Sequence, residues 1–371
     1  MVSTKVVLLG FMLAASTAAH GQTADNGWRA ANQAMGKAME ANDAKAAHRH
    51  GLEALRLYMK AGAPSEQTLV NLALNVADIS LGSQAELETS IREIKKVLAH
   101  LEAKGPATAM NRLYLHNALI TLGKHHGKWD QEVQNHYLAI VNTSEQAYGA
   151  NHPAVAYAHI EYARFLQRMV TRGLATKNLE AAQRIADGLG PDNTNRPAIL
   201  RMLAMYHMEG RRYAKAIAIL EEALGYVSPA NEKQVETWRQ VMGTLAAGYA
   251  RRGEWQKADA TVAQIISNTK ENKEPIMLVS WTPDPLEDWN ERTFVTRARA
   301  HFDIGPDGRA LNIRGETLEG NPQYASYAVE AMKKWRWVPL IRNGKPEHST
   351  GHYMTFNSSR EREARTGSRL P

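Results

Sequence analysis

The chain has no cysteine among its 371 residues, so no disulfide contributes to its stability. A chain of this length suggests two or three domains and can bury a sizeable core, so it could fold without disulfides even in an oxidising compartment. Apolar residues make up 44% of the chain, which is typical of a globular protein and excludes a largely disordered one.

Catalytic and metal-binding motifs are also missing. The sequence contains no HExxH, no GxSxG, no P-loop and no GxGxxG before a helix. His48 and His50 would point to different faces of a helix, and His125 and His126 are adjacent in a predicted turn. A metal needs three or four convergent ligands, so we interpret both pairs as solvated polar residues. We expect no enzymatic activity, no cofactor and no metal site; a cell-wall hydrolase is the enzyme class kept as an alternative.

Strong charge and long apolar runs are sparse. The net charge of +7 is modest and no Lys/Arg block is interleaved with aromatics, so we expect no nucleic-acid partner. The main apolar run, Val6 to Ala15, is shorter than the roughly 20 residues of a membrane-spanning helix. With Lys5 before it and Ala18 and Ala19 after it, the run is typical of a secretory signal peptide over residues 1–21. We expect an exported, soluble mature chain; an uncleaved anchor in the inner membrane is the alternative.

Proline is rare between Trp28 and Thr269, where alanine and leucine recur at i, i+3 and i+4. This spacing places apolar residues on one face of a helix. Residues 22–271 are therefore predicted to form a helical domain almost without interruption.

One stretch of that domain, "LAAGYARRGEWQKADATVAQI", has the pattern of a helical hairpin. Small Ala246 and Ala258 would let two helices approach closely. The large side chains of Tyr249 and Trp255 would fill the space beside them. Gly253 lies between the helices and can adopt the backbone conformation of a tight turn.

Two further stretches repeat this pattern less completely. "LRMLAMYHMEGRRYAKAIAILEEAL" has Gly210, Tyr213 and Ala216, with a turn that reads as one residue longer. A weaker copy has Gly127 and Trp129. These hairpins resemble tetratricopeptide (TPR) repeats, and the resemblance implies stacked helix pairs in a curved α-solenoid whose concave face binds peptides or proteins. One hairpin cannot bury its own apolar face, so stacking is also expected on physical grounds. The alternative is a non-repetitive helical domain.

The pattern changes after the helices. Residues 272–291 are rich in proline and tryptophan and are predicted to be a connector that packs. "TFVTRARAHFDI" then alternates with period two, "GPDG" suits a hairpin turn, and "RALNIRGETL" suits the returning strand. "GNPQYASYAVEAMKKW" predicts a helix, and "GHYMTFN" a final strand. The fold class is therefore mainly α, a TPR-like α-solenoid followed by a small α+β domain of ββαβ order.

Two tryptophans are expected to close the core of this small domain. Trp335 would end the helix against the sheet and Trp337 would pack on the same layer. Pro339 prevents further helix, and Gly344 belongs to the turn before the last strand.

Residues 292–357 resemble the TonB C-terminal domain family. The matching elements are "HFDIGPDGRALNIRG", "AVEAMKKWRWVP", "NGKP" and "YMTF", in the family's order and at about its spacing. The residues that carry the pattern are Phe302, Gly308, Trp335, Pro339, Gly344, Pro346 and Phe356. The resemblance covers under a quarter of the chain, and proteins with this domain after a TPR-like region are often described as energy transducers.

Members of this family bind outer-membrane transporters by adding a transporter peptide to a sheet edge, where unpaired N–H and C=O groups can take an extended partner. The resemblance assigns this edge to the last strand, with the partner-binding residues His352, Tyr353, Met354, Thr355, Phe356 and Asn357. A covered edge and a homodimer seam are the alternatives for this strand.

The chain departs from force-transmitting TonB proteins in two respects. Its N-terminal apolar run looks cleavable, and it has no proline-rich spacer. We therefore expect a periplasmic interaction module of TonB-type transport. The alternative is a periplasmic TPR scaffold or adaptor whose C-terminal domain caps the array or dimerises. Residues 358–371 are predicted to be a disordered tail.

Overall fold

The computed structural model describes residues 25–82, 84–127, 130–169, 172–190, 193–283 and 293–361. The predicted signal peptide and Trp129 lie outside these ranges. The chain divides into two compact units, Met1–Gly149 and Ala150–Pro371, called unit 1 and unit 2 below.

Unit 1 consists of helices that pack as successive antiparallel pairs, α1 with α2, α3 with α4 and α5 with α6. Its core is mainly aliphatic, with Leu55, Leu69, Ile94 and Leu115 almost completely buried. The helices are α1 (Asp25–Glu40), α2 (Ala44–Lys60), α3 (Glu66–Ser80), α4 (Gln84–Ala103), α5 (Ala109–His125) and α6 (Gln131–Tyr148), with a short 3₁₀ helix, η1 (Pro106–Thr108), before α5.

Polar residues fix where several of these helices begin. The carboxylate of Asp43 accepts the N–H of Ala46 at 2.9 Å, and Ser65 Oγ accepts the N–H of Thr68 at 3.3 Å. Asp130 caps α6 in the same way. Each cap satisfies a backbone donor that has no partner within its helix.

His48 corrects the sequence interpretation of the histidines. It is buried, with its Nε2 2.8 Å from Ser90 Oγ, and burial lowers its pKa. His48 therefore belongs to the interior of unit 1 and is not solvated, whereas His125 is exposed.

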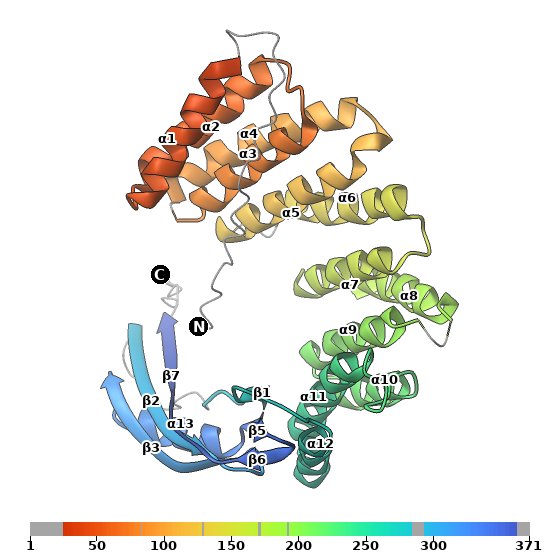
Figure 1. The fold of residues 1–371 in the computed structure, drawn as a ribbon, viewed down its shortest axis with the longest axis vertical. Helices are drawn as coiled ribbons and strands as arrows, with labels where there is room; N and C mark the ends of the chain where they lie inside the picture. Colours follow the sequence, from red (N-terminus) through yellow and green to blue (C-terminus); the bar gives the residue numbers. More distant parts are fainter. Residues whose placement is uncertain are drawn as a thin grey trace, which may run out of the picture. The chain divides into compact units, whose positions relative to one another are not determined.

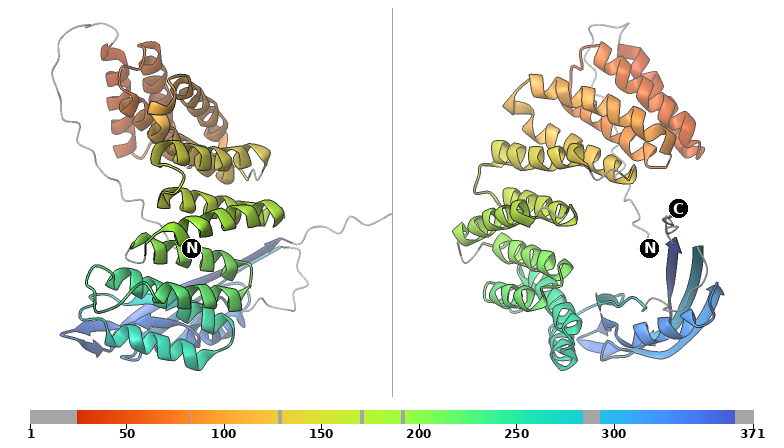
Figure 2. Two further views of the ribbon diagram at one scale, coloured as in Figure 1. Left: turned by 90° about the vertical axis from the view of Figure 1, so that its right-hand side faces the viewer. Right: turned by 180° about the vertical axis from the view of Figure 1, so that it is seen from behind.

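Unit 2 begins with three helical hairpins, α7 with α8, α9 with α10, and α11 with α12, shown in green in Figure 2. The first helices of the hairpins are neighbours, because α9 contacts both α7 and α11. The bounds are α7 (Pro153–Arg168), α8 (Arg172–Gly188), α9 (Asn195–Glu209), α10 (Tyr213–Leu224), α11 (Val235–Arg251) and α12 (Trp255–Ser267). The region is thus a series of stacked hairpins.

The residues that the sequence pattern assigned to the packing of the α11–α12 hairpin lie in its core. Ala246 and Ala258 are fully buried, and Trp255 packs against the same core. Tyr249 is buried and donates its hydroxyl to Glu221 at 2.7 Å; burial and this bond raise the pKa of Tyr249 to about 12.

The turns of the last two hairpins have the same length, which corrects the predicted extra residue. Gly253 has a φ of 83°, and Arg211, not Gly210, takes the equivalent left-handed place with a φ of 56°. The N–H of Arg211 donates to Met208 O at 2.9 Å, as that of Gly253 donates to Ala250 O at 3.0 Å. The glycine of the second hairpin is therefore one position out of register.

The C-terminal domain, in blue in Figure 1, contains a three-stranded antiparallel sheet of order β3–β2–β7, and α13 packs against β2 and β3. Two short two-stranded sheets, β1–β4 and β5–β6, lie beside it. The elements are β1 (Ile276–Val279), β2 (Thr293–Ile304), β3 (Ala310–Glu319), α13 (Tyr324–Lys333), β4 (Arg336–Val338), β5 (Leu340–Arg342), β6 (Lys345–Glu347) and β7 (Ser349–Glu361).

Aromatic rings form the core of this domain. The rings of Trp335 and Trp337 lie 5.6 Å apart, and Phe302 stacks on Trp337 at 5.2 Å. Phe356 meets Trp335 edge-on at 5.8 Å. Trp335 also donates its indole N–H to Trp281 O at 2.7 Å, so a residue of the connector closes this core.

Gly308 lets the β2–β3 turn contact this core. Its φ is 76°, and the N–H of Trp337 donates to Gly308 O at 2.9 Å. A Cβ at residue 308 would lie 2.1 Å from Trp337 O, so a side chain has no room there. Gly344, in the turn between β5 and β6, has a φ of 72° but open space around it.

The ends of the C-terminal domain differ from the predicted boundaries. The connector contains β1, which pairs with β4. At the other end, β7 continues to Glu361, so residues 358–361 are part of the sheet and the prediction of disorder was wrong for them. Residues from 362 onward lie outside the described ranges.

The C-terminal domain and the last hairpin share one core. Val338 and Ile341 are fully buried in the cluster that contains α11 and α12. The backbones of Asn272 and Ile341 exchange two hydrogen bonds, and the amide of Asn272 donates to Pro339 O at 2.6 Å. Because Pro339 separates β4 from β5, this bond holds the chain between the two strands against the segment that follows α12.

Candidate functional site

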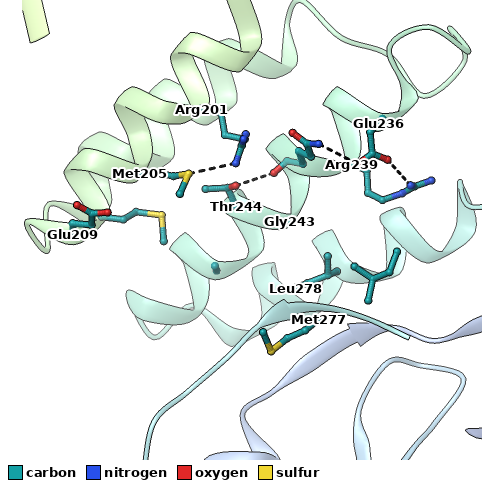
Figure 3. A pocket seen from close by; sticks show the side chains of 13 residues that line it. Arg201, Met205, Glu209, Glu236, Arg239, Gly243, Thr244, Met277 and Leu278 are labelled. Carbon is teal, nitrogen blue, oxygen red and sulfur yellow. Dashed lines mark hydrogen bonds and ion pairs between the residues drawn. The ribbon is translucent and has the colours of Figure 1, made fainter. Parts of the chain in front are cut away.

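The candidate site is a groove in unit 2 with a cavity of about 510 Å³, called the α9–α11 groove below. Figure 3 shows α9 on one side of it, α11 opposite, and β1 along its lower side. Its lining residues are Arg201, Met205, Met208, Glu209, Glu236, Arg239, Gln240, Gly243, Thr244, Ala247, Ile276, Met277 and Leu278.

Small side chains on α11 keep the groove open. Gly243, Thr244 and Ala247 face it where larger residues would fill it. Gly243 also lets β1 approach the helix, because a Cβ there would lie 3.2 Å from Leu278 Cδ2. Met205 and Met208 line the α9 side with flexible thioethers, which adapt to irregular partners.

The groove runs along an edge of β1. Three consecutive residues of this strand, Ile276, Met277 and Leu278, line it. The register of β1 shifts between Met277 and Val279, so its side chains do not alternate strictly there and all three can face the groove. Among the described residues, the edge of β1 away from β4 has no strand partner. The other edge of β1 pairs with β4. Ile276 and Met277 are 40% and 45% exposed, so two adjacent apolar side chains of β1 are accessible to a partner.

Arg201 lines the groove without an ion-pair partner among the described residues, whereas Arg239 on the other side is paired with Glu236. Burial lowers the pKa of the Arg201 guanidinium, and burial raises the pKa of the nearby Tyr157. Its Nη1 lies 3.3 Å from Met205 Sδ, a weak acceptor, and its Nε is buried with no hydrogen-bond partner in the described part of the chain. No described carboxylate lies within 4.0 Å of Arg201.

The two acids at the groove are already engaged. The carboxylate of Glu209 accepts hydrogen bonds from both Nε and Nη2 of Arg164. Glu236 accepts from Arg239 Nη1 at 2.7 Å and from Gln240. The charge of Arg201 is therefore left without a neutralising partner of its own.

The predicted partner-binding residues, His352 to Asn357, all lie on β7. This strand is at an edge of the three-stranded sheet, since only β2 adjoins it. Tyr353 is 64% exposed and lies beside the guanidinium of Arg299, whereas Phe356 is buried. Among the described residues, the outer edge of β7 has no strand partner. The strand does not contribute to the α9–α11 groove.

The described ranges contain neither a metal-binding cluster nor a membrane-spanning helix. No group of three or more His, Cys, Asp or Glu there could hold a metal ion. No helix in those ranges is long and apolar enough to cross a membrane.

Sequence reasoning missed the groove. Its lining comes from three segments that only packing brings together. The signals in the sequence were weak: an extended "IMLV" inside the connector, and Gly243 and Ala247 on one face of a helix. Nothing in the sequence distinguishes Arg201 from an ordinary surface arginine.

Comparisons with known proteins give no family. No family model and no curated protein matches the chain. Solved structures with some similarity include BtubC (BKLC) from P. vanneervenii, with 16% identity, 66% of this chain and 90% of that chain covered, and a TM-score of 0.45.

Two further structures are similar at the same level. A putative kinesin light chain with TPR-like repeats from Podosopora anserina has 18% identity, covers 55% of this chain and 96% of its own, and has a TM-score of 0.41. A signal transduction ATPase with a TPR sensor, PH0952 from Pyrococcus horikoshii, has 14% identity, with 65% and 36% covered and a TM-score of 0.42. Because these TM-scores are below 0.5, the interpretation of the helical region depends on its own turns and packing.

Proposed function

We propose that the chain is a protein-interaction scaffold in which the α9–α11 groove holds an extended peptide segment of a partner protein. The observation that carries this proposal is the groove itself, which combines small and apolar lining with the exposed edge of a strand. Grooves with these features bind peptides by backbone pairing and side-chain pockets.

The C-terminal domain then acts as a cap on the helical array. Repeat arrays need a terminal element that covers the apolar end of the last repeat. Val338 and Ile341 supply that cover, and Asp259 of α12 contacts both Arg336 and Arg309 of the C-terminal domain. The cap also supplies the pairing partner of β1, so it holds one side of the groove in place.

Selection from a random dodecapeptide display library against the full chain tests the main proposal. We expect enriched peptides that bind with micromolar Kd in titrations of the synthetic peptides. Ala247→Tyr should fill the groove and weaken binding at least tenfold, which corresponds to about 1.4 kcal/mol.

The matched control is Ala218→Tyr, the same substitution at an exposed position in the middle of α10 that does not line the groove. Its binding should equal that of the unmodified chain. No enrichment, or equal binding by the two variants, would contradict the proposal.

A second candidate function uses the outer edge of β7. Its open backbone groups favour strand addition by an N-terminal peptide of an outer-membrane transporter, as the TonB resemblance implies. This function requires an exported chain. Removal of residues 1–21 would release the chain into the periplasm, and sequencing the N-terminus of the mature protein tests this removal: a chain that still begins at Met1 would contradict cleavage and favour the inner-membrane anchor.

Photocrosslinking tests the β7 function in cells. Benzoylphenylalanine in place of Tyr353 should capture an outer-membrane transporter, whereas the same change at Tyr114, which is 48% exposed on α5 of unit 1, should not. Equal capture at both positions, or capture of no transporter at Tyr353, would exclude the function. Because neither substitution affects the groove, this outcome leaves the scaffold proposal intact.

A further inference from the structure

We infer that Arg201 selects partners with an acidic side chain, which sits in the α9–α11 groove while the partner backbone pairs with the free edge of β1. This inference rests on the proposed function and specifies the chemistry of the partner. The occupant is one extended peptide segment with Asp or Glu at an internal position.

An unneutralised guanidinium at a partly buried place is costly, because it has lost water without gaining an anion. The described groups around Arg201 do not supply an anion. Met205 contributes a sulfur and Tyr157 a neutral phenol, and the carboxylate of Glu209 is paired with Arg164. A carboxylate from outside would satisfy the guanidinium and its unpartnered Nε. The gain is specific for an anion, since an amide or an ammonium leaves the charge uncompensated.

The repeat register shows why the acid should be internal to the peptide. Leu203 and Leu245 are equivalent in the two hairpins, so Arg201 is level with Gly243 of α11. The groove continues on both sides of that level, towards Glu236 in one direction and towards Ala247 in the other. If the carboxylate beside Arg201 belongs to an internal residue, the peptide can occupy the groove on both sides of Arg201. If it is the C-terminal carboxylate, the peptide ends there and one side of the groove stays empty.

The length of the groove sets the size of the segment. From Glu236 to Ala247 the helix rises about 16 Å, at 1.5 Å per residue. An extended chain advances about 3.3 Å per residue, so roughly five residues fill the groove. Because the groove follows the edge of β1, the backbone of such a segment lies beside the edge that has no strand partner among the described residues. Side chains of the segment would then alternate between the methionines of α9 and solvent.

Pools of fluorescein-labelled hexapeptides with amidated C-termini provide the probe. Each pool has Glu, Gln or Lys fixed at the third position and a mixture of residues elsewhere. We expect the Glu pool to bind the full chain at least tenfold more tightly than the Gln pool and to show the greatest loss on adding salt. Arg201→Met should abolish this preference, whereas Arg29→Met, a change at an exposed arginine of α1, should keep it.

Two further pools test the pairing with β1. In one, the odd residues of the Glu pool carry N-methyl groups, and in the other the even residues do. An extended peptide presents alternate N–H groups to opposite edges, so one of these pools should lose binding and the other should keep it. Equal binding of both would contradict strand pairing.

The failure of this inference differs from the failure of the proposed function. Equal binding of the Glu, Gln and Lys pools, still blocked by Ala247→Tyr, would overturn the acid selectivity and leave the groove as a peptide site. A further hexapeptide pool with a free C-terminal carboxylate and no internal acid tests the position: tighter binding of this pool than of the Glu pool would overturn the internal position. If no pool binds and display selection also fails, the groove is not a peptide site.

Discussion

The helical hairpins and the C-terminal sheet are held together in different ways. The hairpins bury mainly aliphatic side chains and alanines contributed by neighbouring helices, with few aromatic rings among them. The sheet buries Phe302, Trp335, Trp337 and Phe356, which come from three separate segments of the domain. Aromatic rings supply a large buried area in a small domain, but only in one mutual arrangement.

Two glycines, one in a hairpin turn and one in the sheet, show how tightly each region is packed. Gly253 in the α11–α12 turn has open space around it, so only its backbone angle requires glycine. Gly308 in the sheet has both a positive φ and a carbonyl in the place of a side chain. The hairpins should therefore tolerate local changes that the sheet does not.

Gly308→Ala is expected to lower the stability of the protein more than any other change considered below. The new Cβ would collide with Trp337 O, and the turn would have to move away from the aromatic core. We expect a loss of roughly 3 kcal/mol or more in the free energy of unfolding, from overpacking together with the strained backbone. Urea denaturation followed by tryptophan emission measures this loss.

Gly344→Ala is the matched control for that change. Gly344 has a similar φ, but no atom lies within 4 Å of the place that a Cβ would take. Its substitution should cost about 1 kcal/mol, from the backbone angle alone. Equal losses at the two positions would show that the contact with Trp337 has no energetic consequence.

Acid is expected to weaken the helical region through buried histidines. His116 on α5 lies with its Nδ1 3.1 Å from Nδ1 of His136, and burial, with a smaller effect of His136 and Arg112, lowers the pKa of His116 to about 4. Between pH 6.5 and pH 4 the unfolded chain takes up a proton that the folded chain does not. The contribution of His116 to stability should be constant above pH 6.5 and fall by up to about 1.4 kcal/mol per pH unit below it.

Variants separate this effect from general acid denaturation. His116→Gln should lower stability at neutral pH but reduce the slope between pH 6.5 and pH 4. His125→Gln, at an exposed position of the same helix, should keep the slope of the unmodified chain. Thermal unfolding across this pH range distinguishes the two. An unchanged slope in His116→Gln would show that His116 is not responsible.

A smaller loss of stability is expected when the ion pair between α12 and the C-terminal domain is removed. Asp259 on α12 accepts from Arg336 Nε at 2.6 Å, and the Arg336 side chain is 8% exposed. Asp259→Asn should cost about 2 kcal/mol, because the buried guanidinium loses its anion. Calorimetry should also show the sheet unfolding earlier than the helices.

An exposed pair provides the comparison. Glu330→Gln removes a surface ion pair with Lys333, and such pairs contribute about 0–1 kcal/mol. If Asp259→Asn had no more effect than this change, the cap would be held by its apolar contacts alone.

The sequence predicted the features that depend on neighbouring residues. Alternation in "TFVTRARAHFDI" predicted β2, and "GPDG" predicted its turn. The helical region was predicted from spacing, because each helix shows its buried face within a few turns.

Features that depend on distant residues were not predictable in the same way. β1 is only four residues long, and its strand pairing comes from β4, about sixty residues later. The α9–α11 groove combines Arg201, Gly243 and Met277, whose positions relative to one another are fixed only by packing. Residues 358–361 are polar, so their sequence alone suggests a disordered tail; their strand conformation depends on pairing with β2.

The smallest effect compares the two hairpin turns directly. Arg211 is strained by a left-handed backbone that Gly253 adopts freely, since a Cβ in this region crowds the following carbonyl. Arg211→Gly should therefore raise the free energy of unfolding by about 0.5–1 kcal/mol, and Gly253→Ala should lower it by a similar amount. Urea titrations of the two variants, with Gly210→Ala as the reference for the neighbouring position whose φ is −80°, test this pairing. A loss of stability in Arg211→Gly would mean that contacts of the arginine side chain outweigh the relief of its backbone, and that the two turns are equivalent in shape but not in energy.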